Sequence, residues 1–540
     1  MIKKDTYLGN RTYALLFFVL FGLIFSRYCY YGFEYYHQLD DYIQYHNYTA
    51  YNDDLWKLIK SLGMLSSRPL AGLFDLFVWS NFYGAMIIAV GIISAMYAAS
   101  AIFLHKVFSK HFGTGYMFFI IYALLPLGFE GIYWVSASSR IVVGLFFASM
   151  SLLFFDEWCD GGKKSRLVLF AVFQFIAFCF YEQIVLFSGA ATLIVMICYA
   201  NKRSRQRAVW GFLMFANAAL YLAFTQLAPS GVYGERTALF LPWQDGYVEQ
   251  GFLSACWQMI CVFISGGAAT CGKGLLRGFK LLIEEPNFIY VIAILALCSV
   301  LFVTVRKERR ENISFFAELF TGVFLAIAPL LLFFVLKNPW FSARNAVPSF
   351  CGLALVGDAL FDLIFGRLKK SNVIEAALVS AAALLCCTAS ISEIHDYRET
   401  TAADVKIASA ASEALENTGF ESGESIWLLN VDASYVSDAN FYFHEHGYGV
   451  TSSDWALTGA LRAVSGRGDL PLVTPVSVHR HFPVEKKEIE KARILFYTGD
   501  GVVPVSLEKS ETSTWEIKSG SGKLFGTLIY SDGGLTLKTK

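Results

Sequence analysis

The chain has 540 residues, of which 55% are hydrophobic and only 16% are charged. Soluble globular proteins carry about 25% charged residues, so this composition indicates a protein embedded in lipid. The net charge is zero, yet the residues before 394 hold 30 of the 44 basic and 24 of the 44 acidic residues. That balance suits loops beside anionic lipid and gives no indication of a nucleic-acid partner.

Eleven apolar stretches approach the length of about 20 residues that a helix needs to cross a bilayer. The run over residues 167–200 is interrupted at Tyr181-Glu182-Gln183, and we divide it there into two spans joined by a tight turn. As a single tilted helix, the same run would invert the orientation of everything that follows. The predicted spans cover residues 12–33, 81–104, 114–129, 137–155, 167–181, 183–200, 209–228, 286–305, 314–336, 347–366 and 373–393.

Basic clusters support this division because they fall in every second connection between the predicted spans. Residues 163–166 contain three Lys or Arg residues, and residues 202–207 and 306–310 each contain four. Cytoplasmic connections carry such an excess of basic residues. The pattern therefore predicts a cytoplasmic N-terminus and places the residues after the last span on the outer face.

The composition changes after Ile394, and the rest of the chain predicts a small extracytoplasmic α/β domain. Residues 402–416 read as a helix, whereas residues 425–431, 493–497 and 523–530 have the pattern of strands separated by glycine-containing turns. The predicted fold is a polytopic α-helical membrane domain, residues 1–393, followed by the outer domain, residues 394–540.

The first outer connection, residues 34–80, contains two adjacent carboxylates, Asp40 and Asp41. Adjacent carboxylates repel each other, which raises the pKa of one of them and favours general-base catalysis near neutral pH. A base at this position could act on the hydroxyl group of an acceptor. The alternatives are a solvated acidic loop or a helix cap.

Other charged residues lie near the outer ends of the predicted spans. Arg68 and Arg344 could bind a phosphate, because a guanidinium group offers a fork of donors; Arg68 could instead cap a helix at the membrane surface. Glu130, Arg140 and Glu182 lie where ionisable groups face a cavity or a partner, or else extend to the membrane interface.

A second long outer connection, residues 229–285, contains a basic amphipathic segment. Lys273, Arg277 and Lys280 are spaced four and three residues apart, so they share one face of a helix. This face could contact a substrate, or the segment could be an interfacial helix that contacts lipid headgroups.

An acidic pair in the first outer connection, the element Ser67-Arg68-Pro69, many spans and an outer C-terminal domain together resemble the GT-C superfamily of membrane glycosyltransferases. The likeness is greatest to bacterial members that glucosylate O-antigen or other envelope glycans. Those enzymes have an Asp-Asp pair and a Gly-Arg-Pro-like element in this connection, and Ser67 stands here in place of the glycine. The architectural likeness covers residues 10–390.

The resemblance implies an enzyme of the bacterial inner membrane that takes a sugar from a polyprenyl-phosphate carrier. The acceptor would be a glycan or a lipid-linked molecule on the outer face. Asp40 or Asp41 would deprotonate the acceptor hydroxyl, and Arg344, with Arg68 or Lys273, would stabilise the departing phosphate.

Further roles follow from the same resemblance. Glu130 and Glu182 would orient sugar hydroxyls or basic side chains, and Tyr133, Trp134 and Trp340 would stack on sugar faces. No cofactor is implied: a monophosphate leaving group does not require a metal, and the sequence has no zinc-binding pattern.

Three other functions remain open. A transporter or lipid-carrier flippase explains the spans, although many transporters have repeated halves, which this sequence lacks. A polymerase or ligase of lipid-linked glycans would depend on the large outer connection at residues 229–285. A non-enzymatic assembly protein would have no need of the Asp40-Asp41 pair.

Overall fold

The computed structural model divides the chain into two compact units. The first contains the described residues up to 35 and from 68 to 394, and the second contains residues 36–43 and the described residues from 395 onward. Asp40 and Asp41 therefore belong to the second unit. The structure describes residues 9–43, 68–200, 204–227, 238–306, 315–337, 339, 341–365, 371–421, 424–432, 448–477, 482–489 and 491–540.

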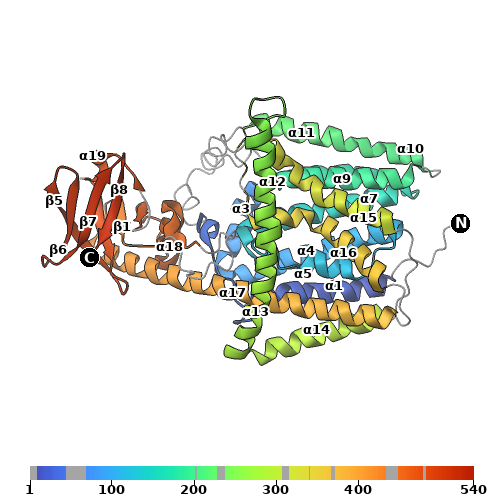
Figure 1. The fold of residues 1–540 in the computed structure, drawn as a ribbon, viewed down its shortest axis with the longest axis horizontal. Helices are drawn as coiled ribbons and strands as arrows, with labels where there is room; N and C mark the ends of the chain where they lie inside the picture. Colours follow the sequence, from blue (N-terminus) through green and yellow to red (C-terminus); the bar gives the residue numbers. More distant parts are fainter. Residues whose placement is uncertain are drawn as a thin grey trace. The chain divides into compact units, whose positions relative to one another are not determined.

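The first unit consists of helices that run mostly side by side (Figure 1). Its first half contains α1 (Asn10–Phe25), η1 (Ser26–Tyr28), α3 (Pro69–Phe77), η4 (Trp79–Ala85), α4 (Met86–Phe112), α5 (Met117–Leu124), α6 (Glu130–Tyr133), α7 (Val135–Cys159), α8 (Lys164–Phe178) and α9 (Glu182–Tyr199). Its second half contains α10 (Arg205–Ala208), η5 (Val209–Phe212), α11 (Leu213–Leu227), η6 (Tyr247–Leu253), α12 (Ser254–Met259), η7 (Ile260–Gly266), α13 (Gly267–Glu284), α14 (Phe288–Arg306), α15 (Phe315–Ile327), η8 (Ala328–Phe334), η9 (Ala343–Ser349) and α16 (Phe350–Phe365). Helix α17 (Ser371–Thr418) begins in this unit.

Among the described residues, ten helical segments are long and apolar enough to cross a membrane, which confirms a membrane protein. Nine of them coincide with predicted spans. The predicted spans at residues 114–129 and 167–181 correspond to the shorter helices α5 and α8, of 8 and 15 residues. The tenth segment, Tyr247–Glu284, occupies most of what we predicted to be an outer connection.

The division of the apolar run at residues 167–200 is confirmed as two helices, because α8 ends at Phe178 and α9 begins at Glu182. Tyr181 has an extended backbone and precedes the first turn of α9. Helix α4 stops at Gly113, whose φ of +76° is the left-handed conformation that terminates a helix.

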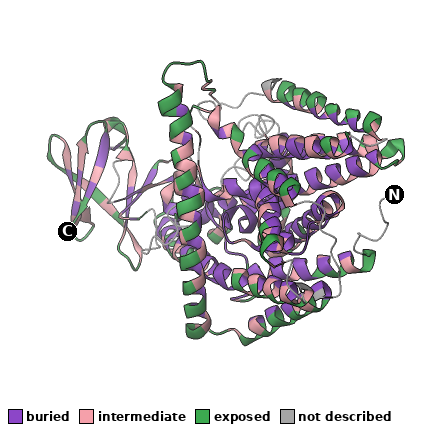
Figure 2. Ribbon diagram, turned by 45° about the vertical axis from the view of Figure 1, so that its right-hand side comes forward, coloured by how far each residue is buried: buried purple, intermediate pink, exposed green. Residues whose placement is uncertain are grey.

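Helix α7 lies in the core of the first unit and packs against α4, α8 and α9. Helices α15 and α16 form a second close pair, and α16 also packs against α5. Figure 2 shows buried residues concentrated on the helices in the middle of this unit and exposed residues on those at its edge. Large apolar side chains such as Leu222, Ile292 and Phe320 are exposed on those outer helices, as expected of a surface whose solvent is lipid.

The second unit is built around one eight-stranded sheet with the order β2-β1-β4-β5-β6-β7-β8-β3. Strand β1 is parallel to β2 and β4, and the remaining neighbours are antiparallel. Its elements are η2 (Leu39–Tyr42), β1 (Ile426–Leu429), η11 (Val450–Ser452), α18 (Asp454–Ser465), β2 (Val473–Val476), β3 (Phe482–Pro483), α19 (Lys486–Ile489), β4 (Arg493–Tyr497), β5 (Val502–Glu511), β6 (Thr514–Ser519), β7 (Leu524–Ser531) and β8 (Gly534–Thr539).

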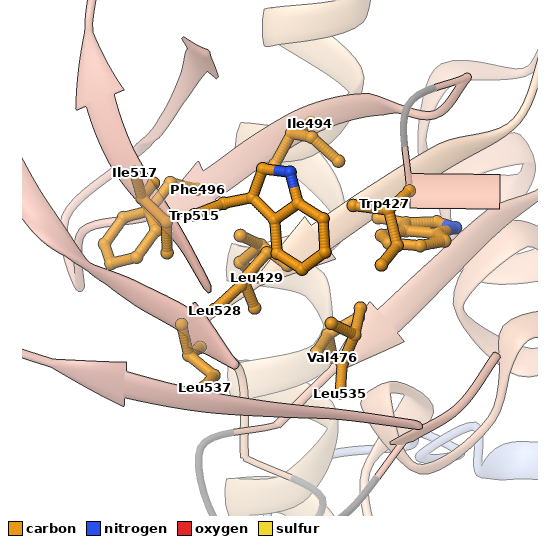
Figure 3. Close-up of a cluster of buried hydrophobic side chains, with 11 residues drawn as sticks. Trp427, Leu429, Val476, Ile494, Phe496, Trp515, Ile517, Leu528, Leu535 and Leu537 are labelled. Atoms are coloured by element: carbon orange, nitrogen blue, oxygen red, sulfur yellow. The ribbon is translucent and has the colours of Figure 1, made fainter. Parts of the chain in front are cut away.

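The sheet curls around an apolar core (Figure 3). Trp427 from β1 and Leu535 from β8 belong to the same buried cluster, although four strands lie between β1 and β8 in the sheet order. The ring of Phe482 on β3 lies 5.8 Å from that of Trp427. The two edges of the sheet therefore approach each other, as in a partly closed barrel. A C-terminal sheet domain is confirmed.

Candidate functional site

Three arginine–carboxylate pairs of the first unit lie at the ends of its helices, close to Tyr181. They join residues that are far apart in sequence and include all five charged positions singled out at the span ends. We call this group the ion-pair cluster; its members are Arg68, Asp75, Glu130, Arg140, Tyr181, Glu182, Arg344 and Asn345.

The pair of Arg68 and Glu182 joins the start of α3 to the start of α9. Arg68 Nε donates to Glu182 Oε2 at 2.7 Å, and Nη2 donates to Oε1 at 2.6 Å, so the contact is bidentate. The guanidinium carbon lies 4.5 Å from the ring centre of Tyr181, within range of a cation–π interaction. Both charged side chains remain partly exposed, so they lie at the surface of the helical unit.

The pair of Arg344 and Glu130 joins η9 to α6. Arg344 Nη1 donates to Glu130 Oε1 at 3.0 Å, and the Glu130 side chain is completely buried whereas Arg344 is partly exposed. The guanidinium carbon of Arg344 also lies 5.3 Å from the ring centre of Trp134. A buried carboxylate is costly unless it is paired, and Arg344 supplies a charged partner for Glu130.

Two glycines allow this pair to form. A β-carbon at Gly131 would lie only 3.0 Å from Arg344 Cβ and 2.9 Å from a methyl carbon of Val347. At Gly128, φ is +66° and a β-carbon would lie 2.9 Å from the carbonyl oxygen of Ala343. The sequence Leu127-Gly-Phe-Glu-Gly131 therefore brings α6 against η9, and so brings Glu130 to Arg344.

The third pair joins Arg140 on α7 to Asp75 on α3. Arg140 Nη2 donates to Asp75 Oδ2 at 2.9 Å, and Ser139 Oγ donates to Asp75 Oδ1 at 3.4 Å. The charge of Arg140 also acts on Glu182. Sequence reasoning missed Asp75, although a single carboxylate in the apolar run at residues 69–77 was a usable signal.

Tyr181 and Asn345 connect the first two pairs. Asn345 Nδ2 donates to the Tyr181 hydroxyl at 3.1 Å, and the backbone N–H of Ser342 donates to Asn345 Oδ1 at 2.8 Å. Burial raises the pKa of Tyr181, and the neighbouring Arg68 charge only partly opposes this effect. The phenol therefore stays protonated near neutral pH, as a neutral part of the ion-pair cluster.

The acidic pair of the second unit divides into a buried and a partly exposed residue. Asp41 Oδ2 accepts the backbone N–H of Gln38 at 2.9 Å, which completes a reciprocal cap on η2. Asp41 is buried, whereas Asp40 is partly exposed. The helix-cap alternative is thus confirmed for Asp41.

Further contacts fix the position of η2 within the second unit. Gln38 Nε2 donates to Thr401 Oγ1 at 3.1 Å, on the part of α17 that belongs to this unit. A β-carbon at Gly459 of α18 would lie 2.2 Å from the carbonyl oxygen of Tyr42. The backbone that carries Asp40 is therefore held on two sides.

Lys273 and Arg277 lie on α13, as the predicted helical spacing requires. Lys280, on the same helix, forms an exposed contact with Glu284 at 3.6 Å. Within the part of the chain that the structure describes, no group of three or more His, Cys, Asp or Glu side chains could hold a metal ion.

The burial of Tyr133 and Trp134 corrects the prediction that these residues stack on a sugar. Tyr133 and Trp134 are almost completely buried. The ring of Tyr133 stacks on those of Tyr28 and Phe129, at centre distances of 4.7 and 5.2 Å. Protein groups already occupy the faces that a sugar would need, because these residues pack the junction of helix ends. Trp340 lies outside the described residues.

Replacing Gly131 with alanine is expected to destabilise the unit by about 1–3 kcal/mol, because the new methyl group overpacks the contact between α6 and η9. The measurement is the apparent melting temperature of the purified protein in detergent. The matched control is Gly189→Ala in α9, where a β-carbon meets nothing within 4 Å. That control should be neutral or stabilising by up to about 1 kcal/mol, and equal melting temperatures for the two variants would contradict the close approach.

No protein-family model matches the chain, and no curated protein is similar to it in sequence. A function must therefore be inferred from the residues of this chain. What they establish is a membrane protein with a C-terminal sheet domain and an ion-pair cluster at its helix ends.

Proposed function

We propose that the chain is a membrane glycosyltransferase of the GT-C type, which moves a sugar from a polyprenyl-phosphate carrier to a glycan or lipid-linked acceptor. The reaction would take place on the outer face of the bacterial inner membrane, with the C-terminal domain on that face. The alternation of basic connections along the sequence supports this orientation.

The observation that carries the proposal is the ion-pair cluster. Arginines from α3, α7 and η9 are partly exposed at the ends of apolar helices, each fixed by a carboxylate from another element. Ionisable groups within membrane-spanning segments are costly and often mark the path of a substrate or an ion. Guanidinium groups held in place suit the phosphate of a lipid carrier, whose polyprenyl chain would stay among the apolar helices.

In this proposal the acceptor hydroxyl gives its proton to Asp40. The acceptor oxygen then forms a bond to the anomeric carbon of the sugar, and the bond from that carbon to the phosphate oxygen breaks. The electron pair leaves with the polyprenyl phosphate, and fixed cations such as Arg344 stabilise the charge that develops there. Asp41 would position Asp40 by capping η2.

The test is an assay of the full chain in proteoliposomes with polyprenyl phosphate that carries radiolabelled glucose. We expect release of the lipid phosphate and transfer of label to a water-soluble or larger lipid-linked product. Movement of the intact lipid-linked sugar across the bilayer would instead indicate a flippase. Activity only with a diphosphate-linked oligosaccharide would indicate a polymerase or ligase, and failure to bind polyprenyl phosphate at all would exclude the proposal.

A further inference from the structure

The segment Tyr247–Glu284 is a single helical stretch of 38 residues made of η6, α12, η7 and α13. By length and hydropathy it could cross a membrane. At 1.5 Å per residue, however, its 38 residues extend about 57 Å, nearly twice the thickness of the hydrocarbon core. A straight crossing would leave much of the helix outside the bilayer.

Contacts along the first half of the segment show what it passes over. The hydroxyl of Tyr247 donates to the carbonyl oxygen of Phe334, the last residue of η8, at 2.8 Å. Twenty residues later, Gly267 packs so closely on Leu127 that a β-carbon would lie 2.8 Å from its side chain. Leu127 follows the C-terminal end of α5.

The other end of the segment lies beside the end of α1. The hydroxyl of Tyr30, just after η1, donates to the carbonyl oxygen of Glu285 at 2.8 Å. The side chain of Asn287 donates to the carbonyl oxygen of Tyr30 at 2.7 Å. The segment thus meets in turn the C-terminal ends of η8, α5 and α1, which a helix parallel to these elements would not do. Figure 1 shows α12 and α13 running across the direction of α1, α5, α14 and α16.

The two faces of the segment differ in residue size. The face against the bundle carries small buried residues, which let the backbones approach closely: Gly251, Ala255, Gly267, Thr270, Gly274 and Gly278. At Gly278 a β-carbon would lie 2.0 Å from the carbonyl oxygen of Thr388 on α17. The opposite face exposes large apolar side chains, with Trp257, Leu276 and Ile283 between 66% and 80% exposed.

Exposed apolar side chains recur beyond the polar residues Glu284, Glu285 and Asn287, where the next span begins. After Ile283 come Phe288 and Ile289 at the start of α14, which are 74% and 83% exposed. The charged side chains of Lys273 and Lys280 lie on the same helix as the exposed apolar residues. Apolar residues with interspersed lysines are typical of a helix that lies at the boundary between headgroups and acyl chains.

We propose that Tyr247–Glu284 does not cross the bilayer but lies in its plane, with the outer face of the helix bound to the lipid of one leaflet. The residues before Tyr247 and after Glu284 are then on the same side of the membrane. This assignment removes one of the ten candidate spans and sets the orientation of α14 and of every helix that follows.

The test uses pairs of single cysteines in the full chain, after replacement of the native cysteines with alanine. The pair Trp257→Cys and Leu276→Cys spans 19 residues, or about 28 Å of helix. Each cysteine is labelled with an environment-sensitive fluorophore, the protein is reconstituted in vesicles, and depth is measured by quenching with lipids that carry nitroxides at different acyl positions. We expect both labels to lie at the same shallow depth.

The control pair lies in α14, where Ile289→Cys and Val303→Cys are 14 residues, or about 21 Å, apart along a span. Their depths should differ clearly in the same vesicles. A second pair with the spacing of the test pair, Ile264→Cys and Ile283→Cys, serves if a variant of the first pair does not fold. A depth difference in either test pair as large as in α14 would overturn the proposal. Quenching by aqueous iodide but not by lipid nitroxides would also overturn it.

Discussion

Replacing Asp40 with asparagine is expected to lower the rate of sugar transfer by about 10²–10⁴-fold, the usual contribution of a general base. Asparagine keeps the size of the side chain but cannot accept the proton of the acceptor hydroxyl. The measurement is the initial rate with labelled polyprenyl-phosphate glucose at saturating donor. Asp40→Glu should recover part of the lost rate, since it restores a carboxylate near the same place.

The matched control is Asp41→Asn. Its amide oxygen can still accept the backbone N–H of Gln38, the hydrogen bond that Asp41 makes at 2.9 Å. The variant should therefore retain most of the activity, whereas Asp41→Ala should lose about 1 kcal/mol of stability with the cap. If Asp41→Asn were inactive and Asp40→Asn fully active, the roles of the two carboxylates would be exchanged.

Replacing Arg344 with alanine is expected to cost about 3–5 kcal/mol of stability, because it removes the arginine that pairs with the buried carboxylate of Glu130. The variant should also lose sugar transfer, since Arg344 is proposed to hold the departing phosphate. The measurements are the apparent melting temperature in detergent and the initial rate of transfer in vesicles.

A double variant separates the two effects. Arg344→Gln combined with Glu130→Gln replaces the ion pair with two neutral amides, which can hydrogen-bond to each other. We expect most of the lost stability to return, because no buried charge is left unpaired. Transfer should remain impaired, and wild-type activity in the double variant would show that Arg344 serves only the fold.

The apolar spans could be predicted because lipid imposes a simple rule of length and hydropathy. The break between α8 and α9 was visible because Tyr181-Glu182-Gln183 interrupts the apolar run. The helix at Tyr247–Glu284 was only partly recognised. Its glycines, such as Gly274 and Gly278, weaken the helical pattern, yet they are the residues that allow close packing on the bundle.

The strands, like the helices, could be predicted only where the local sequence pattern was clear. Strands β1, β4 and β7 were predicted, because residues 425–431, 493–497 and 523–530 have the alternating pattern of strands. Strands β5 and β8 alternate with exposed polar residues such as Glu508 and Lys538. Such alternation is a weak signal in the sequence, because the buried face of each strand can be identified only in the folded sheet.

The charged residues of the candidate site were predicted for a physical reason, since an ionisable group near lipid is unusual. Their partners could not be predicted, because pairing of Arg68 with Glu182 or of Arg344 with Glu130 depends on how distant helices pack. The cap formed by Asp41 was left as one of several alternatives, because the short helix η2 has no apolar periodicity of its own.

The sequence separation within the ion-pair cluster has a consequence for biosynthesis. Glu130 precedes Arg344 by 214 residues, so at 5–20 residues per second the ribosome makes its partner roughly 10–40 s later. During that interval a nascent chain that ends before η9 contains Glu130 but not yet Arg344. Chains truncated there should be retained by the insertion machinery or degraded, whereas chains that extend past Arg344 should be released into the membrane.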